Sequence, residues 1–265
     1  MADAPASARQ LLDFYLEAGA DALIGEEPVD RFAEPAPVSR TVPAAPAPSK
    51  PDRVPLVPAA APAPAAPDAA ATEAREAARS ARTLDELRAI LERFDGCALK
   101  ATASRLVFSD GNPDARVMLV GEAPGRDEDI EGVPFVGRSG KLLDLMLAAI
   151  GLDRSSVYIA NVVPWRPPGN RTPTPQETQI CLPFITRQIA LADPDILVCL
   201  GGPSAQTLLG QSGITKIRGR WFPFHSGARE IRAMPTFHPA FLLRSPLQKR
   251  FAWRDFLAIK KALGG

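Results

Sequence analysis

The sequence has little cysteine and no long apolar run, and each lack excludes a class of protein. Only three cysteines occur in 265 residues, which argues against a disulfide framework. No apolar run is long enough to span a membrane, and the N-terminus has no apolar core of the signal-peptide type. We therefore expect a soluble, cytoplasmic protein that contacts no membrane.

The two parts of the chain carry opposite net charge. Residues 97–265 contain 21 Lys and Arg against 14 Asp and Glu, whereas residues 1–96 contain 10 against 16. A basic C-terminal part suits a polyanionic partner, because phosphate contacts supply most of the sequence-independent affinity for nucleic acid. An ordinary solvated surface is the alternative interpretation of the same charges. We do not expect the acidic part to contact DNA.

The first 72 residues differ in composition from the rest. Ser7 and Gln10 form a capping-box pattern, and apolar residues from Leu11 to Leu23 then lie mainly on one side of a helix. We expect this helix, within residues 1–33, to pack on the rest of the chain or to dock on a protein partner. Residues 34–72 contain 11 prolines without periodicity, which predicts a disordered linker.

Residues 73–265 have the pattern of one α/β domain. An Ala/Arg/Glu helix comes first, and Thr83 with Glu86 caps a second helix. Apolar runs then alternate with helical patterns, which predicts a mostly parallel, four-stranded sheet covered on both faces. The expected strands lie at 117–120, 157–163, 196–200 and 231–237, and the expected helices at 139–150, 175–191, 203–210 and 251–263.

Three short loops, each at the end of an expected strand, contain Gly, Pro and polar residues. They are Gly121–Gly125, Asn161–Arg171 and Thr236–Ala240, and the third holds one of only two histidines. An open α/β sheet binds its ligand at the carboxyl ends of the strands. The three loops therefore predict one site.

From about Cys97 onward the chain resembles the uracil-DNA glycosylases, and most of all family 4 of that superfamily. The resemblance implies a three-layer α/β/α fold and a hydrolase that removes uracil from DNA. It rests on several long motifs in the family's order: GEAPGRDEDIEGVPFVGRSGKLLDLMLAAIGL (121–152), NVVPWRPPGNRTPTPQE (161–177), LGGPSAQTLLG (200–210), ITKIRGRWF (214–222) and TFHPAFLLR (236–244).

The resemblance implies roles for three residues around a flipped base. His238 would donate a hydrogen bond to uracil O2, Asn161 would read the base edge at O4 and N3, and Phe135 would stack on the ring. Each has a structural alternative: a histidine satisfied in the core, a strand-end cap and a core aromatic, respectively.

The Gly121–Gly125 loop would bring Gly121 and Ala123 to the base. In the best-known glycosylases of the superfamily an aspartate here orients the water, and Ala123 stands at that position. We therefore expect Glu122 to orient the water. The acidic run 127–129 is the runner-up, although a solvated turn is the stronger interpretation for Asp127 and Glu128.

The motifs also imply DNA contacts. Leu242 and Leu243 resemble the wedge that fills the space left by the flipped nucleotide, with core packing as the alternative. The side chains expected to hold the DNA backbone are Arg166, Asn170, Arg171 and Arg244.

Family 4 enzymes typically carry a [4Fe–4S] cluster, which needs four thiolate-type ligands. The matching positions are Cys97, Lys100, Trp165 and Cys181, so two of the four cysteines are replaced. Cys199 lies inside an apolar strand and is better interpreted as a small buried hydrophobic residue. We therefore expect no cluster, no other metal and no cofactor.

These observations favour a monofunctional DNA-repair glycosylase, expected to be monomeric and associated with the nucleoid, which flips uracil out of DNA and leaves an abasic site. The alternative is a protein that binds uracil-DNA without catalysis. A related branch traps DNA through a histidine in the loop equivalent to 166–172, and this loop has no histidine. A third hypothesis, compatible with the first, is that the N-terminal helix recruits the domain to a partner.

Overall fold

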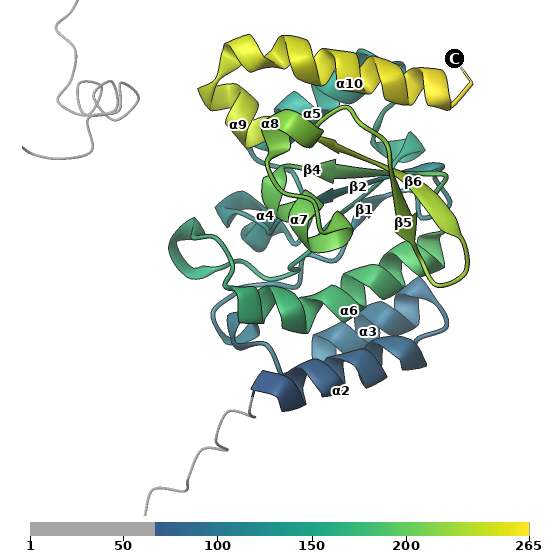
Figure 1. Ribbon diagram of the computed structural model, residues 1–265. Helices are drawn as coiled ribbons and strands as arrows, with labels where there is room; N and C mark the ends of the chain where they lie inside the picture. The colour runs from purple at the N-terminus through teal and green to yellow at the C-terminus, as the bar shows by residue number, and fades with distance from the viewer. Residues whose placement is uncertain (1–66, 265) are drawn as a thin grey trace, which may run out of the picture. The chain divides into compact units, whose positions relative to one another are not determined.

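The structure is a computed structural model that describes residues 67–264. It consists of one sheet with helices on both faces (Figure 1). The strands are β1 (Asp110–Gly111), β2 (Val117–Gly121), β3 (Tyr158–Asn161), β4 (Ile196–Leu200), β5 (Phe222–His225) and β6 (Glu230–Thr236). The α-helices are α2 (Pro67–Ser80), α3 (Leu84–Arg93), α4 (Arg126–Glu131), α5 (Arg138–Ala148), α6 (Pro175–Ala192), α7 (Gly202–Leu209), α8 (Ile214–Ile217), α9 (Pro239–Arg244) and α10 (Lys249–Ala262), and the 3₁₀ helices are η1 (Ala98–Ala101), η2 (Arg154–Ser156), η3 (Pro168–Asn170) and η4 (Pro246–Gln248).

The strand order is β1-β3-β2-β4-β6-β5. The four strands that the sequence predicts are the central, mutually parallel ones, and the α/β class is confirmed. The predicted number of strands was wrong, because β1 and β5 add antiparallel edges. β1 has only two residues, and Pro223 interrupts the short apolar stretch of β5, so neither has the usual pattern of a strand; an edge position tolerates both features.

Alternate strand residues bury opposite faces of the sheet. In β2, Val117 and Leu119 pack towards α5 and α10, whereas Met118 and Val120 pack towards α6 and the helices outside it. Figure 1 shows the resulting layers, with α5 and α10 on one side and α6, α3 and α2 on the other. Both faces are apolar, which is why the central strands read as continuous apolar runs.

The folded part begins before the expected end of the linker. α2 starts at Pro67, a residue that is favourable in the first turn of a helix. Ala70, Ala74 and Ala78 recur every four residues and are buried, and α2 packs against α6. Small side chains allow the two helices to approach closely. The predicted helix within residues 1–33, the partner expected for it and most of the predicted linker lie outside the described residues.

Local signals place the next helix correctly. Thr83 is the N-cap of α3, and its side-chain oxygen accepts a hydrogen bond from the Glu86 backbone N–H. Within residues 67–264, no helix is long and apolar enough to cross a membrane.

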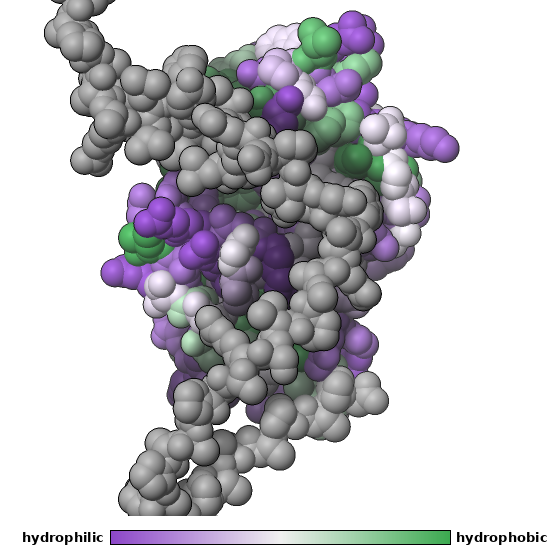
Figure 2. All heavy atoms as spheres, turned by 90° about the vertical axis from the view of Figure 1, so that its left-hand side faces the viewer, coloured by the Kyte–Doolittle hydropathy of each residue, from purple (hydrophilic) through white to green (hydrophobic). Residues whose placement is uncertain are grey.

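The parallel register brings the predicted loops together. Gly121 at the end of β2 pairs with Asn161 at the end of β3, and Leu200 of β4 pairs with Thr236 of β6. The loops that follow these residues therefore leave the sheet at one edge. Figure 2 views the molecule from the side towards which these strands run in Figure 1, and many hydrophilic side chains are visible there.

Candidate active site

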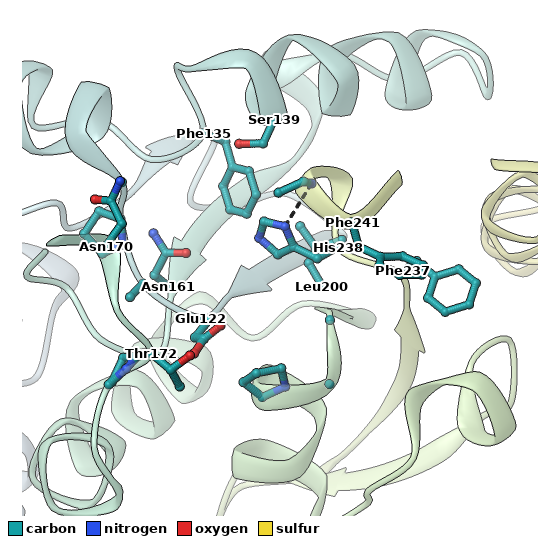
Figure 3. A pocket seen from close by; sticks show the side chains of 18 of the residues that line it. Glu122, Phe135, Ser139, Asn161, Asn170, Thr172, Leu200, Phe237, His238 and Phe241 are labelled. Carbon is teal, nitrogen blue, oxygen red and sulfur yellow. Dashed lines mark hydrogen bonds between the residues drawn. The ribbon is translucent and has the colours of Figure 1, made fainter. Parts of the chain in front are cut away.

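A cavity of about 690 Å³ lies at the carboxyl edge of the sheet. Segments far apart in the sequence line it, including the loops after β2, β3, β4 and β6 (Figure 3). The structure thus brings together most of the predicted site residues, namely Glu122, Ala123, Phe135, Asn161, Asn170, Arg171, His238 and Arg244. Gly121, Arg166 and Leu242 do not line the cavity.

Glu122 lines the cavity, and one of its two carboxylate oxygens has an unmet hydrogen bond. Its Oε1 atom is buried and has no hydrogen-bond partner among the described residues. Burial raises the pKa of this carboxyl above its ordinary value of 4.5, because a charged carboxylate is poorly solvated there. A buried polar atom without a partner is costly in a folded protein, so this oxygen would be stabilised by a hydrogen bond.

His238 is held in one orientation by its own turn. It is the N-cap of α9, and its Nδ1 accepts a hydrogen bond from the Ala240 backbone N–H at 3.1 Å. Burial lowers the pKa of His238 to about 4, and the positive charge of Arg244 acts in the same direction. The ring is therefore neutral near pH 7, and with Nδ1 accepting, its proton lies on Nε2. His238 is a neutral hydrogen-bond donor in the cavity.

Phe135 and Asn161 lie above the end of β2. The Phe135 ring is 5.5 Å from the His238 ring, centroid to centroid, with 31° between their planes. A Cβ atom at Gly121 would collide with the Phe135 ring and with Asn161 Oδ1, so only glycine allows both side chains to cross this position. Gly121 thus shapes the cavity without lining it. Figure 3 shows Phe135, His238 and Asn161 as neighbours.

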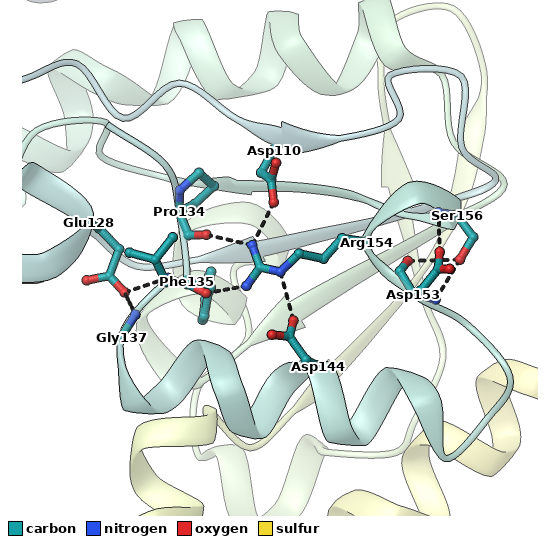
Figure 4. Close-up of polar contacts among 10 residues, drawn as sticks. Asp110, Glu128, Pro134, Phe135, Gly137, Asp144, Asp153, Arg154 and Ser156 are labelled. Carbon is teal, nitrogen blue, oxygen red and sulfur yellow. Dashed lines mark hydrogen bonds and ion pairs between the residues drawn. The ribbon is translucent and has the colours of Figure 1, made fainter. Parts of the chain in front are cut away.

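The backbone that carries Phe135 is strained and is anchored by Arg154. Phe135 has a φ of 55°, in the left-handed region that non-glycine residues rarely adopt. Arg154 donates hydrogen bonds to the carbonyl oxygens of Pro134 and Phe135. It also pairs with Asp110 at 2.6 Å and with Asp144 at 2.8 Å (Figure 4). One guanidinium therefore ties the Phe135 loop to β1 and α5.

Glu128 anchors the same loop from its other end. This carboxylate is buried and accepts hydrogen bonds from the backbone N–H groups of Gly125, Val136 and Gly137. The expectation of a solvated turn was wrong for Glu128, because its carboxylate points back to the backbone amides of the Phe135 loop. Asp129 is also buried, and it accepts from the backbone N–H of Ser104 at 2.7 Å.

The side chains predicted to bind phosphate differ in whether they already have a partner in the protein. Arg171 forms a two-pronged pair with Glu177, at 2.8 and 2.7 Å, and Arg166 donates to Asn170 Oδ1 at 2.7 Å. Arg244 is exposed, and no described residue forms an ion pair with it. The uncompensated positive charge at the rim of the cavity is therefore that of Arg244.

The leucines after His238 lie in different environments. Leu242 is only 1% exposed and packs with Phe237 and Ala252. Leu247, in η4 directly after α9, is 83% exposed. Leu242 can leave the core only by opening a cavity there, whereas Leu247 already faces solvent.

One wall of the cavity was missed in the sequence analysis. Gly201, Gly202 and Pro203 follow β4 and line the cavity, as do Ser139 and Phe241. The Gly-Gly-Pro run after an apolar strand carries the same signal as the three predicted loops.

The four positions that match the family's cluster ligands do not provide a thiolate set. Cys97 Sγ and Cys181 Sγ are 3.9 Å apart, and Trp165 is 2% exposed and packed in the same core. Lys100 Nζ donates to Asp95 Oδ1 and to the Glu92 carbonyl oxygen, both at 2.7 Å. Cys199 is buried in β4, and desolvation raises its pKa to about 12. Among residues 67–264, no group of three or more His, Cys, Asp or Glu is arranged to hold a metal ion.

Comparison with known proteins first defines the class. A model of the uracil DNA glycosylase superfamily matches residues 108–257, which is more than half of the chain and includes the residues described above. The chain therefore belongs to this superfamily.

Individual relatives define the family more closely. The type-4 uracil-DNA glycosylase of Archaeoglobus fulgidus is 38% identical over 187 residues, which cover 69% of this chain and 94% of that protein. The type-4 enzyme of Thermotoga maritima is 41% identical over 169 residues, covering 62% and 86%. A type-5 uracil-DNA glycosylase of Thermus thermophilus is 32% identical over 140 residues, covering 47% and 62%. The chain belongs to the type-4 uracil-DNA glycosylase family.

Arg154→Met should destabilise the fold, because it leaves two carboxylates and two loop carbonyl oxygens without their shared donor. We expect a loss of about 2–3 kcal/mol in the free energy of unfolding, measured by urea denaturation. Arg116→Met is the matched control: Arg116 pairs with Asp195 at 2.7 Å on the surface, and its loss should cost less than about 1 kcal/mol. Equal losses in the two variants would contradict the anchoring role of Arg154.

Proposed function

We propose that the chain takes a uracil flipped out of DNA into this cavity and hydrolyses its N-glycosidic bond, leaving an abasic site. The observation that carries the proposal is the buried, unpartnered Oε1 of Glu122 in the same cavity as a neutral, oriented His238. Hydrolysis of this bond needs an acceptor for a proton of the attacking water and a donor for the departing base. The cavity supplies one group of each kind.

His238 and Asn161 would act on the base. As the C1′–N1 bond breaks, negative charge develops on the uracil and is shared with O2. A hydrogen bond from His238 Nε2–H to O2 strengthens as that charge grows, which lowers the barrier. The Asn161 carboxamide, at the end of β3, can donate to O4 and accept from N3–H. Cytosine presents the opposite pattern at both atoms, so Asn161 would discriminate against it.

Glu122 would act on the water. Its carboxylate would accept a proton as the water oxygen forms a bond to C1′, and the electrons of the C1′–N1 bond would leave with the base. Phe135 would cover one face of the uracil and exclude bulk water. Ala123 has no polar side-chain atom for this step, and the carboxylates of Glu128 and Asp129 already bind backbone N–H groups.

Glu122→Gln and His238→Ala should each slow uracil excision. Glu122→Gln removes the proton acceptor, and we expect its rate to fall roughly 10²–10⁴-fold. His238→Ala removes the hydrogen-bond donor, and we expect its rate to fall roughly 10²–10³-fold. The measurement is a single-turnover time course on a labelled oligonucleotide with one uracil, followed by alkali to break abasic sites. Wild-type protein that binds the uracil oligonucleotide without cleaving it would favour the non-catalytic alternative.

Two exposed residues outside the cavity provide matched controls. Glu131→Gln, at the end of α4, and His225→Ala, in β5, make the same chemical changes elsewhere and should leave the rate unchanged. The pH dependence then separates the two roles. The rate should fall as the pH drops through the raised pKa of Glu122, because a protonated carboxyl cannot accept a proton, and Glu122→Gln should lack this fall. His238 stays neutral until the pH approaches about 4, so it adds no fall above that value.

We also propose that the DNA backbone follows the rim of the cavity. Arg244 would neutralise a phosphate, and Arg166, Asn170 and Arg171 would position the strand beside it. Leu242 would have to leave the core to act as the wedge in the base stack. Leu247 needs no such rearrangement, and the exposed cations Lys249 and Arg250 follow it. An exposed apolar tip beside positive charges is the arrangement that opens a base step in other DNA-bending proteins.

Leu247→Ala should reduce excision from double-stranded DNA by about 10-fold or more. A base that leaves a duplex loses its stacking and pairing, and the inserted leucine would compensate for part of that loss. Excision from single-stranded DNA should change little, since no base pair is opened. Leu242→Ala should instead lower the free energy of unfolding by about 2–5 kcal/mol, as a truncation in the core does. The ratio of excision from double-stranded DNA to excision from single-stranded DNA decides between the two leucines. If this ratio is unchanged in Leu247→Ala but lowered in Leu242→Ala protein that is still folded, the wedge is Leu242.

We propose, finally, that the chain works without an iron–sulfur cluster, because Cys97 and Cys181 are two thiols where four ligands are needed. Protein purified under argon should contain far less than one iron atom per chain and show no brown absorbance band. Dialysis against a chelator should leave uracil excision unchanged. Stoichiometric iron and sulfide would contradict the proposal.

A further inference from the structure

Two buried thiols lie within reach of one another, away from the cavity. Cys97 Sγ and Cys181 Sγ are 3.9 Å apart, although the residues are 84 positions apart in the sequence. Neither residue lines the cavity. A disulfide bond requires about 2.05 Å, so the two sulfur atoms need to approach by roughly 2 Å.

Aromatic packing holds the two thiols opposite each other. Phe94 ends α3, and its ring contacts Phe184 of α6 edge-on, with 5.0 Å between the ring centroids. Phe184 lies one helical turn after Cys181, so both point from α6 towards the segment that follows α3. Cys97 is the third residue after Phe94 in that segment. The contact that fixes the segment against α6 thus also fixes the distance between the thiols.

The surroundings of the pair limit what it can do. Trp165 is buried in the same core, and the Lys100 ammonium group is bound by Asp95 and the Glu92 carbonyl, so neither position offers a further thiolate. Within residues 67–264 no third metal-ligating side chain completes a site. The reaction open to two adjacent thiols alone is two-electron oxidation to a disulfide.

We propose that Cys97 and Cys181 form a redox site that closes to a disulfide on reaction with a hydroperoxide. Cys97 would react first. Both thiols are buried, but Cys97 lies in an irregular segment between the exposed residues Asp95 and Ala98, whereas Cys181 lies within α6. The Cys97 sulfur attacks one peroxide oxygen and breaks the O–O bond, which gives a sulfenic acid and, for hydrogen peroxide, one water molecule.

The second step closes the bond. The Cys181 sulfur attacks the Cys97 sulfur, the S–O bond breaks, and a second water molecule leaves with the thiol proton. Altogether, two thiols lose two electrons and two protons to one peroxide molecule. The product links the segment after α3 to α6 and closes a loop that contains β1, β2, α4, α5 and β3. Such a loop restricts the unfolded chain, so oxidation should stabilise the fold.

The test uses the purified full-length chain and hydrogen peroxide. After treatment, the protein is unfolded in denaturant, free thiols are alkylated and the peptides are analysed by mass spectrometry without reduction. We expect a cross-linked Cys97–Cys181 peptide, an alkylated Cys199 and a midpoint of thermal unfolding raised by roughly 5–10 °C, all reversed by dithiothreitol. A sulfinic acid at Cys97 with Cys181 still free, or a disulfide between two chains, would overturn the proposal.

Variants separate the site from general oxidation. Cys199→Ser should keep the cross-link and the shift in the unfolding midpoint, whereas Cys97→Ser should lose both. The peptide analysis of the wild-type chain decides the question even if a variant folds poorly. Because its readouts are covalent structure and thermal stability, the result is independent of whether the chain excises uracil.

Discussion

The active-site cavity depends on how the loop before α5 is held. Glu128 binds backbone N–H groups at one end of this loop, and Arg154 binds carbonyl oxygens at the other. Together these two charged side chains hold Phe135 at a positive φ that its own conformational preference opposes. A Cβ atom at Gly140, the third residue of α5, would collide with the Phe135 carbonyl group, so α5 must have glycine at this position. The position of the Phe135 ring in the cavity is thus a product of backbone strain that several distant residues sustain together.

Burial shifts the pKa values of Glu122 and His238 in opposite directions, and both shifts favour the neutral form of the side chain. The pKa of Glu122 is raised and that of His238 is lowered. A neutral histidine is suited to donate a hydrogen bond to a developing anion without losing its proton. Arg244 lowers the pKa of His238 and also carries an unpaired charge at the rim, so in the proposed function one residue would attract DNA and keep the donor neutral.

The layer formed by α2, α3 and α6 is held together by close packing. The alanines of α2 lie against α6, and Trp165 fills space beside the cysteine pair. The two remaining thiols lie close enough for covalent chemistry of their own, because the contact between Phe94 and Phe184 holds their segments together. The region around Trp165, which stands at one of the family's cysteine positions, is therefore closely packed.

Local sequence determined the central architecture and most of the candidate site. Apolar runs and caps indicated the four central strands and the main helices, because burial on both faces of a parallel sheet leaves a clear pattern. Glu122, Asn161 and His238 were expected in one site, and the cavity contains all three. Their roles stay proposals. Only the tertiary structure decided which Leu after His238 is exposed, that Glu128 is buried, and that Arg154 and Cys181 have partners far away in sequence. Those properties depend on contacts between distant segments, and no local pattern encodes them.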